Sequence, residues 1–151
     1  MKVLTDQMLS IVVPLYNEED NVVLLTQKIH ESLVGYSYQI IYIDDFSTDA
    51  TRKVVKKMND TKVHLIALKK NYGQSLALAA GIDYAEGEYI ITMDGDLQND
   101  PSDIPQMLAY AVRGEYDLIT GIRQKRKDSL VKKIPSKIAN FLVRRVTKLD
   151  I

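Results

Sequence analysis

The sequence predicts an α/β fold in which a mostly parallel central sheet is covered by helices on both faces. Short apolar runs rich in β-branched residues alternate with helical patterns along the first 121 residues. Parallel strands need such helical crossovers, so this order indicates a layered α/β/α, Rossmann-like domain. The 151 residues, 46% apolar and 26% charged, suit one soluble globular domain. The absence of cysteine excludes disulfides, thiolate nucleophiles and zinc–thiolate sites.

The first half of the chain predicts three strands and two helices. Residues 9–15 (LSIVVPL) are short, β-branched and closed by proline, as in a buried strand. A helix follows, because Val22, Leu25 and Ile29 recur at helical spacing. Residues 38–44 predict a second strand. A helix then opens with Ser47, Thr48 and Asp49, which are good capping residues. Residues 62–68 (KVHLIAL) predict the third strand.

The second half continues the alternation. We expect an alanine-rich helix over residues 74–85, a strand over 88–94 (EYIITMD) and a helix from Pro101 to about Arg113. Residues 116–121 (YDLITG) predict a fifth strand. Residues 1–121 form the predicted core and hold 10 basic and 18 acidic residues. Residues 122–151 hold 10 basic and only two acidic residues, so we expect this tail to meet an anionic partner.

In parallel α/β sheets, ligands bind beyond the carboxyl ends of the strands. Those ends carry acidic and amide side chains here, and neither GxGxxG nor GxxxxGK[ST] is present. Asp94 and Asp96 lie two residues apart at one strand end, with Gln98 nearby. These hard oxygen ligands suit Mg²⁺ or Mn²⁺ and leave positions that diphosphate oxygens can fill. The alternative is that the two aspartates start the Pro101 helix or solvate a turn.

Three further charged residues have both a functional and a structural interpretation. Asp45, at a strand end, either accepts the N–H of a nucleobase or caps the next helix. Ser47 and Asp49 are expected to be mainly caps. Glu18 either lines a site or is a first-turn acid favoured by the helix dipole. Arg123 either neutralises a phosphate or is an ordinary surface arginine.

Four motifs, in this order and spacing, resemble the family 2 glycosyltransferases. They are SIVVPLYNEED, IIYIDDFSTDAT, KKNYGQSLALAAGIDYAEGEYIITMDGDLQNDP and GIR. The resemblance covers nearly the whole chain and is closest to the branch that transfers sugars to polyprenyl phosphates, which includes dolichol-phosphate mannose synthase. It implies a GT-A fold, a UDP- or GDP-sugar donor, a divalent cation and inversion at the anomeric carbon.

The resemblance also implies roles for individual residues. Asp96 and Arg123 act in catalysis, Arg123 beside the donor diphosphate, and Asp94, Asp96 and Gln98 hold the metal. The nucleotide-sugar-binding set is Pro14, Tyr16, Glu18, Ile43, Asp45, Asp94, Gly95, Asp96 and Arg123. Phe46 stands where the family usually has glycine, and Gly95 where alanine is common. These departures affect the expected donor preference more than the expected activity.

The tail predicts a basic amphipathic helix. Its apolar arc includes Ile134, Ile138 and Phe141, and lysines and arginines lie mostly on the other arc. Residues 129–151 are expected either to meet an anionic membrane surface or to pack on the domain's own sheet. We expect a cytoplasmic protein at the membrane face, with a lipid phosphate as acceptor and no nucleic-acid partner. A glycan acceptor, or a nucleotide-binding module without transfer activity, are the alternatives. Relatives continue beyond this point, so a truncated chain is expected.

Overall fold

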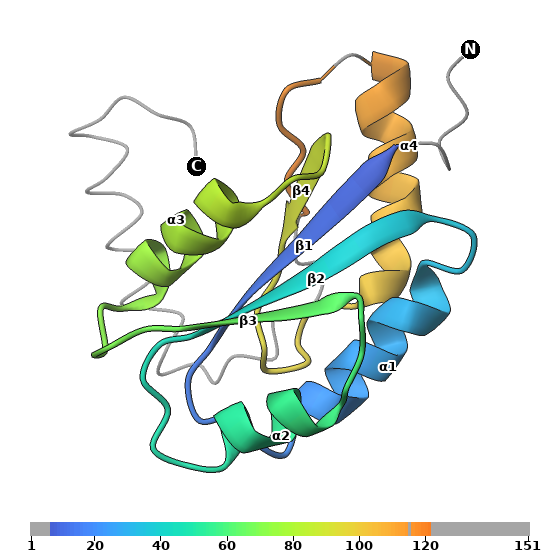
Figure 1. Ribbon diagram of the computed structural model, residues 1–151. Coiled ribbons are helices and arrows are strands. Elements are labelled where there is room, and N and C mark those ends of the chain that lie inside the picture. The colour runs from blue at the N-terminus through green and yellow to red at the C-terminus, as the bar shows by residue number, and fades with distance from the viewer. Residues whose placement is uncertain (1–6, 115, 122–151) are drawn as a thin grey trace, which may run out of the picture. The chain divides into compact units, whose positions relative to one another are not determined.

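The computed structural model describes residues 7–114 and 116–121, which contain a four-stranded parallel sheet (Figure 1). The strand order is β3-β2-β1-β4, and every neighbouring pair is parallel. The strands are β1 (Met8–Leu15), β2 (Ser37–Asp44), β3 (Val63–Ala67) and β4 (Tyr89–Thr92). The four strands predicted from residues 9–94 are therefore confirmed, and the two central ones, β1 and β2, are the most deeply buried.

Side chains of the central strands alternate between two apolar clusters on opposite faces of the sheet. Leu9, Ile11 and Val13 of β1 point into the larger cluster, whereas Val12 lies in the smaller one with Ile41. All five are fully buried. Burial on both faces explains why these strands are largely apolar and do not simply alternate apolar and polar residues.

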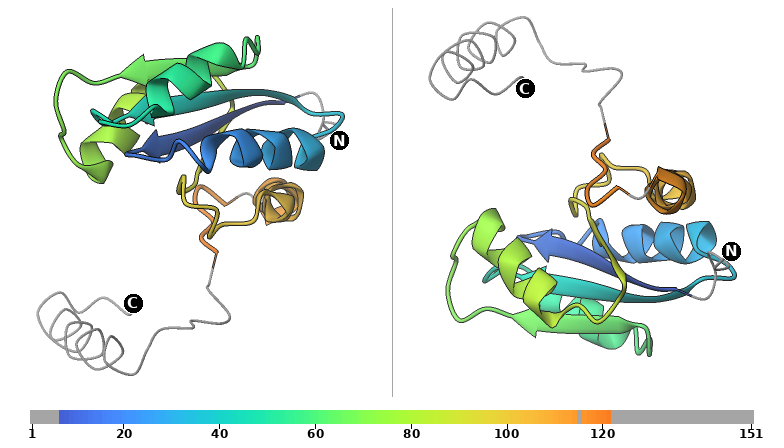
Figure 2. Two further views of the ribbon diagram at one scale, coloured as in Figure 1. Left: turned by 90° about the horizontal axis from the view of Figure 1, so that it is seen from below. Right: turned by 90° about the horizontal axis from the view of Figure 1, so that it is seen from above.

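The larger cluster is covered by α1 (Val22–Ser32), α2 (Thr51–Lys57) and α4 (Ile104–Gly114). A short 3₁₀ turn, η2 (Pro101–Asp103), leads into α4, so the helix expected from Pro101 is present. Figure 2 shows α1 and α4 on the same side of the sheet. The opposite face is covered by α3 (Gln74–Tyr84), whose Ala77 lies in the smaller cluster. The predicted three-layer arrangement is confirmed.

The predicted fifth strand is wrong for residues 116–121, which form no strand in the structure. The backbone N–H of Tyr116 donates to the carbonyl of Ala111 at 3.2 Å, so the segment begins with a hydrogen bond to the last turn of α4. Leu118 is 79% exposed and gains little from burial. The strand-like composition of residues 116–121 therefore lies in a segment without regular secondary structure.

The outer side of β4 has no strand beside it within the described residues. Ile90 of β4 is 42% exposed, and a groove of about 830 Å³ lined mainly by apolar side chains of β4, α4 and residues 116–119 runs along it. In the part of the chain that the structure describes, no helix has the length and apolarity to cross a membrane. The chain divides into two compact units, residues 1–119 and 120–151, and nearly all of the second lies outside the described residues.

Candidate functional site

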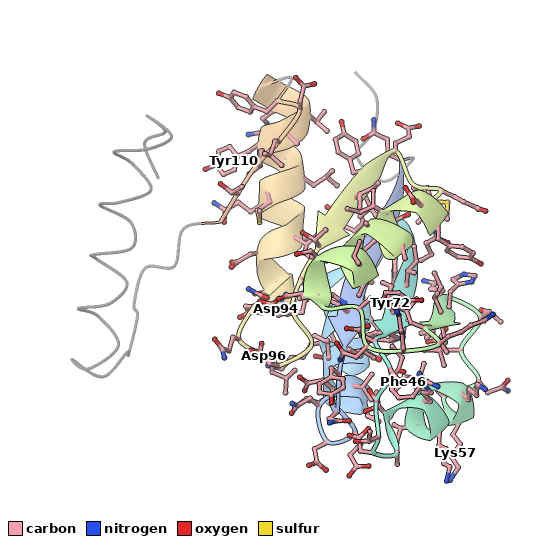
Figure 3. The ribbon with its side chains drawn as sticks, turned by 90° about the vertical axis from the view of Figure 1, so that its left-hand side faces the viewer. Phe46, Lys57, Tyr72, Asp94, Asp96 and Tyr110 are labelled. Atoms are coloured by element: carbon pink, nitrogen blue, oxygen red, sulfur yellow. The ribbon has the colours of Figure 1, made fainter. Side chains whose placement is uncertain are left out.

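A pocket of about 300 Å³ lies where β1, β2 and β4 end. Each lining residue is at a strand end, in the loop that follows it, or at the start of α3. The lining residues are Pro14, Leu15, Tyr16, Glu18, Asp45, Gln74, Asp94, Gly95 and Asp96. Parallel strands bring their carboxyl ends to one edge of the sheet, which is why residues as far apart in the sequence as Pro14 and Asp96 meet here. Figure 3 shows Asp94 and Asp96 together on the turn after β4.

Asp45 is 4% exposed and anchors the loop that leads into α3. One carboxylate oxygen accepts the backbone N–H of Tyr72 at 2.7 Å, and the other accepts that of Gly73 at 2.8 Å. The side-chain amide of Asn71 donates to the Asp45 carbonyl at 3.2 Å. Each carboxylate oxygen can accept a second hydrogen bond, so Asp45 retains the capacity to accept a nucleobase N–H. Its role as a cap of the following helix α2 is not observed.

The neighbouring Asp44 has a structural role. It is fully buried and forms an ion pair with Nε of Arg52, and one of its oxygens accepts the N–H of Ser47 at 3.1 Å. The guanidinium of Arg52 also donates to the Leu68 carbonyl at 3.0 Å. A buried carboxylate needs such a partner, because its desolvation is otherwise uncompensated. The pair ties the end of β2 to α2 and to the residue that follows β3.

Hydrogen bonds join the loop after β1 to the loop after β2. The N–H of Asn17 donates to Oγ of Ser47 at 2.9 Å, and Oδ1 of Asn17 accepts the N–H of Thr48 at 2.8 Å. The N–H of Glu18 donates to Oγ1 of Thr51 at 2.9 Å. Ser47 is therefore a link between loops and not a helix cap. These bonds fix the loop that carries Tyr16 and Glu18 into the pocket.

Asp49 does act near the start of α2. Its carboxylate accepts the N–H and hydroxyl of Thr51, at 3.0 and 2.5 Å, and the N–H of Glu19 at 3.2 Å. Partial burial raises the pKa of Asp49, but these hydrogen bonds lower it by more, so the net shift is downward. Glu18 precedes α1, whose first turn contains no acidic residue. Its carboxylate instead accepts the Asn21 amide at 2.6 Å, so the first-turn interpretation of Glu18 is wrong.

The turn after β4 presents its two aspartates to the same pocket. The backbone N–H of Asp94 donates to Oδ1 of Asn99 at 2.8 Å, and Oδ1 of Asp94 accepts the side-chain amide of Gln74 at 2.7 Å. Asp96 is exposed, and its Oδ1 accepts the backbone N–H of Gln98 at 3.0 Å. The turn is held mostly by its own hydrogen bonds and by α3, and its carboxylates face the pocket.

Gly95 lies buried between these aspartates, against the end of β1. A Cβ at this position would come within 2.8 Å of Cδ2 of Leu15 and 3.3 Å of the Pro14 carbonyl. Leu15 is fully buried, so an alanine here would require the core to shift. Glycine therefore lets the acidic turn lie directly on β1 in this chain.

The donor set of the pocket fits a hard divalent cation. Its acidic side chains are Glu18, Asp45, Asp94 and Asp96, and no lysine or arginine of the described residues lines it. Carboxylate oxygens are the ligands that Mg²⁺ and Mn²⁺ prefer. The described residues contain no group of three or more His, Cys, Asp and Glu side chains arranged to hold a metal by themselves. A cation here would therefore need additional oxygens, such as those of a ligand.

The structure brings together most of the predicted site residues. Those that line the pocket are Pro14, Tyr16, Glu18, Asp45, Asp94, Gly95 and Asp96. Ile43 is fully buried beneath α3 and does not line it. The Gln98 side chain is exposed beside the pocket, where its backbone N–H contacts Asp96. Arg123 and the tail lie outside the described residues. Sequence reasoning missed Gln74, which follows a recognised strand-end loop but was counted only as the first residue of a helix.

The model of the family described as glycosyl transferase family 2 matches residues 10–150. The chain belongs to this family. It is 47% identical over 146 residues to a dodecaprenyl-phosphate galacturonate synthase of Rhizobium johnstonii. That match covers 92% of this chain and 43% of the relative. It is 39% identical over 143 residues to an undecaprenyl-phosphate 4-deoxy-4-formamido-L-arabinose transferase of Pectobacterium carotovorum, covering 91% of this chain and 43% of the relative.

A solved structure of another glycosyltransferase agrees with the fold. A mannosyltransferase from Pyrobaculum calidifontis, in complex with GDP-Man and Mn²⁺, superposes with a TM-score of 0.58 at 25% identity. The match covers 76% of this chain and 34% of that chain. The GT-A fold and the family expected from the motifs are thus confirmed. The chain spans less than half the length of the curated relatives that it matches.

Proposed function

We propose that this protein takes part in an inverting, metal-dependent transfer of a hexose from a UDP- or GDP-sugar to a polyprenyl phosphate. The observation that carries the proposal is the pocket at the strand ends, with four acidic side chains and no cationic one among its described lining residues. A nucleoside diphosphate is itself anionic and would be repelled by these carboxylates. Binding of such a donor therefore requires a cation between the two, and Mg²⁺ or Mn²⁺ meets that need.

The proposed donor would lie with its nucleobase at one side of the pocket and its diphosphate at the other. Pro14, Tyr16 and Asp45 lie on the β1–β2 side, where a ring can contact Tyr16 and an N–H can donate to Asp45. Asp94 and Asp96 lie on the β4 side and would hold the cation, with Gln98 next to them. When bound, the cation would act as a Lewis acid that offsets negative charge on the departing nucleoside diphosphate. Arg123 is proposed to neutralise the same diphosphate from the segment after Gly121.

The proposed acceptor is supported by the two curated relatives, whose names specify dodecaprenyl and undecaprenyl phosphate. A phosphate monoester has a second pKa of about 6, so its oxygen is already ionised near neutral pH. In the proposed step this oxygen attacks the anomeric carbon from the face opposite the diphosphate. A new bond forms between the acceptor phosphate oxygen and the anomeric carbon. The bond between that carbon and the diphosphate oxygen breaks, and the nucleoside diphosphate leaves. No protein group is then needed as general base.

The proposed location is the cytoplasmic face of a membrane, where a lipid-linked acceptor is accessible. The proposal rests on the charge of residues 122–151 and on their amphipathic pattern. Flotation with anionic liposomes, comparing the protein with and without residues 129–151, tests it. The full chain is expected to float with the vesicles, and equal partitioning of both proteins would contradict a membrane role for the tail.

The donor site is tested by calorimetry with UDP and GDP, each with and without Mn²⁺. We expect Mn²⁺ to strengthen binding of one nucleotide, and Asp96→Ala to remove that increment. Asp83→Ala is a matched control, because Asp83 is an exposed aspartate on α3 that does not line the pocket. Binding that depends neither on Mn²⁺ nor on Asp96 would refute the proposed site.

The acceptor is tested by incubating the full-length protein with labelled nucleotide sugars and polyprenyl phosphate. A labelled product that partitions into organic solvent supports transfer to lipid. A water-soluble product would indicate a glycan acceptor. Nucleotide binding by these 151 residues without any turnover would instead indicate a nucleotide-binding module without transfer activity.

A further inference from the structure

We propose that Gln74 is a positioning residue, whose side-chain amide holds the Asp94 carboxylate in the orientation that binds the cation and the donor diphosphate. This inference rests on the proposed function. Gln74 is the first residue of α3, and Asp94 follows β4 twenty positions later. The two side chains meet in the pocket, where Nε2 of Gln74 donates to Oδ1 of Asp94 at 2.7 Å.

The contact is a charge-assisted hydrogen bond of short length, which is stronger and more directional than a bond between neutral groups. The bond uses one acceptor position of Oδ1 of Asp94, and a carboxylate has several such positions on its two oxygens. A glutamine amide is also uncharged. A lysine at the same position would orient the carboxylate but would repel a divalent cation, whereas the amide orients it without that repulsion.

Gln74 is itself held in place through Asp45. The carboxylate of Asp45 accepts the N–H groups of Tyr72 and Gly73, the two residues that precede Gln74. Gly73 has a φ of +87°, a conformation that favours glycine, and its carbonyl accepts the N–H of Ala77 at 3.1 Å to begin α3. The start of α3 is therefore clamped to the end of β2, and the direction of the Gln74 side chain is set by that clamp.

Asp94 is held from a second direction. Its backbone N–H donates to Oδ1 of Asn99, on the far side of the same turn. The bond to Asn99 fixes the main chain, and the bond to Gln74 fixes the carboxylate. A line of contacts thus runs from Asp45, proposed to meet the nucleobase, through Gln74 to Asp94, proposed to meet the cation. Gln74 links the two ends of the donor site.

The alternative is that Gln74 forms an ordinary surface hydrogen bond with no functional consequence. Gln74 is exposed and lies outside both apolar clusters, so its substitution is not expected to affect folding. Its effect on ligand binding can therefore be measured in folded protein. Gln27 provides a matched control, since its Nε2 donates to Oε1 of Glu31 at 2.9 Å on the exposed face of α1, outside the pocket.

The experiment compares wild type with Gln74→Ala, Gln74→Glu and Gln27→Ala by calorimetry, each with and without Mn²⁺. The probes are UDP and GDP, and UMP and GMP, which lack the second phosphate. Gln74→Ala is expected to weaken diphosphate binding about tenfold, as for loss of a hydrogen bond to a charged group. It should leave monophosphate affinity within about twofold, because the nucleobase end is untouched. Gln74→Glu keeps the length of the side chain but faces Asp94 with a like charge, so diphosphate binding without Mn²⁺ should weaken further.

Each outcome is informative. If Gln74→Ala binds UDP and GDP as tightly as Gln27→Ala does, Gln74 has no positioning role. Equal weakening of diphosphate and monophosphate binding would show a general effect on the pocket and would also overturn the inference. If the wild type shows no Mn²⁺-dependent binding of either diphosphate, the proposed function fails, and the inference fails with it. Unchanged thermal melting of all variants confirms that folding is not the cause.

Discussion

Replacing Gly87 with alanine should destabilise the protein through a collision with the backbone of β1. Gly87 lies between α3 and β4, and its N–H donates to Oγ of Ser10 at 2.9 Å. A Cβ at Gly87 would lie 2.7 Å from both the Met8 carbonyl oxygen and the Ser10 nitrogen, and 2.8 Å from the Leu9 carbonyl carbon. These are main-chain atoms of a central strand, so no change of rotamer relieves the contact.

The size of the effect follows from opposing contributions to the free energy of unfolding. Contacts under 3.0 Å are essentially never seen for real Cβ atoms, so β1 and the Gly87 segment must separate. Overpacking of this kind typically costs about 1–3 kcal/mol. Weakening the bond to Ser10 costs about 1 kcal/mol more. Alanine also lowers the conformational entropy of the unfolded chain, which stabilises the folded state by about 0.4–1 kcal/mol. The net expectation is a loss of about 2 kcal/mol.

Urea denaturation followed by circular dichroism measures this loss. With a slope of about 2 kcal/mol per molar, the midpoint should fall by about 1 M. Gly121→Ala is the matched control, because a Cβ there meets nothing within 4 Å and its backbone is not in the positive-φ region. Its midpoint should stay close to that of the wild type. If both alanine variants unfold at the same urea concentration, the close approach of Gly87 to β1 is not a constraint on this fold.

Three further predictions concern stability. Phe46 has a φ of +67°, so Phe46→Gly should be more stable than Phe46→Ala by about 1 kcal/mol in the same urea assay; equal stability would argue against backbone strain. Arg52→Met leaves the buried Asp44 unpaired and should cost about 3–5 kcal/mol, with recovery in the Arg52→Met/Asp44→Asn double variant; no recovery would argue against the ion pair. For Asp60, burial raises the pKa, but bonds from Lys62 and His30 lower it by more, below the ordinary value of 3.8. Its stabilisation is present above about pH 4 and is lost as pH falls through the lowered pKa, so Asp60→Asn should flatten the acid limb of a stability–pH curve.

The sequence was sufficient for the regular elements because their signals are local. Continuous apolar runs predicted β1 and β2, and the helix expected over residues 74–85 is α3, Gln74–Tyr84. Residues 116–121 have the composition of a strand, but whether a strand forms depends on a partner edge. Composition alone could not show that this segment would instead close α4.

Part of the candidate site was predictable because many of its residues lie at strand ends. Parallel topology alone brings Asp45, Asp94 and Asp96 together. Side-chain bonds across loops were not predictable, because they depend on tertiary geometry. Ser47 has the composition of a helix cap but bonds to Asn17, and Gln74 is an unremarkable helical residue until its distance to Asp94 is known.

The outer side of β4 has a practical consequence for solution measurements. Among residues 7–114 and 116–121 no strand pairs with this side, so its backbone N–H and C=O groups have no sheet partner there, and the apolar groove beside it adds surface that water wets poorly. Two molecules that meet along this side can pair these backbone groups and bury the apolar groove at the same time. At the concentrations used for calorimetry, self-association would release heat unrelated to nucleotide, so titrations should be run alongside light scattering and repeated on dilution.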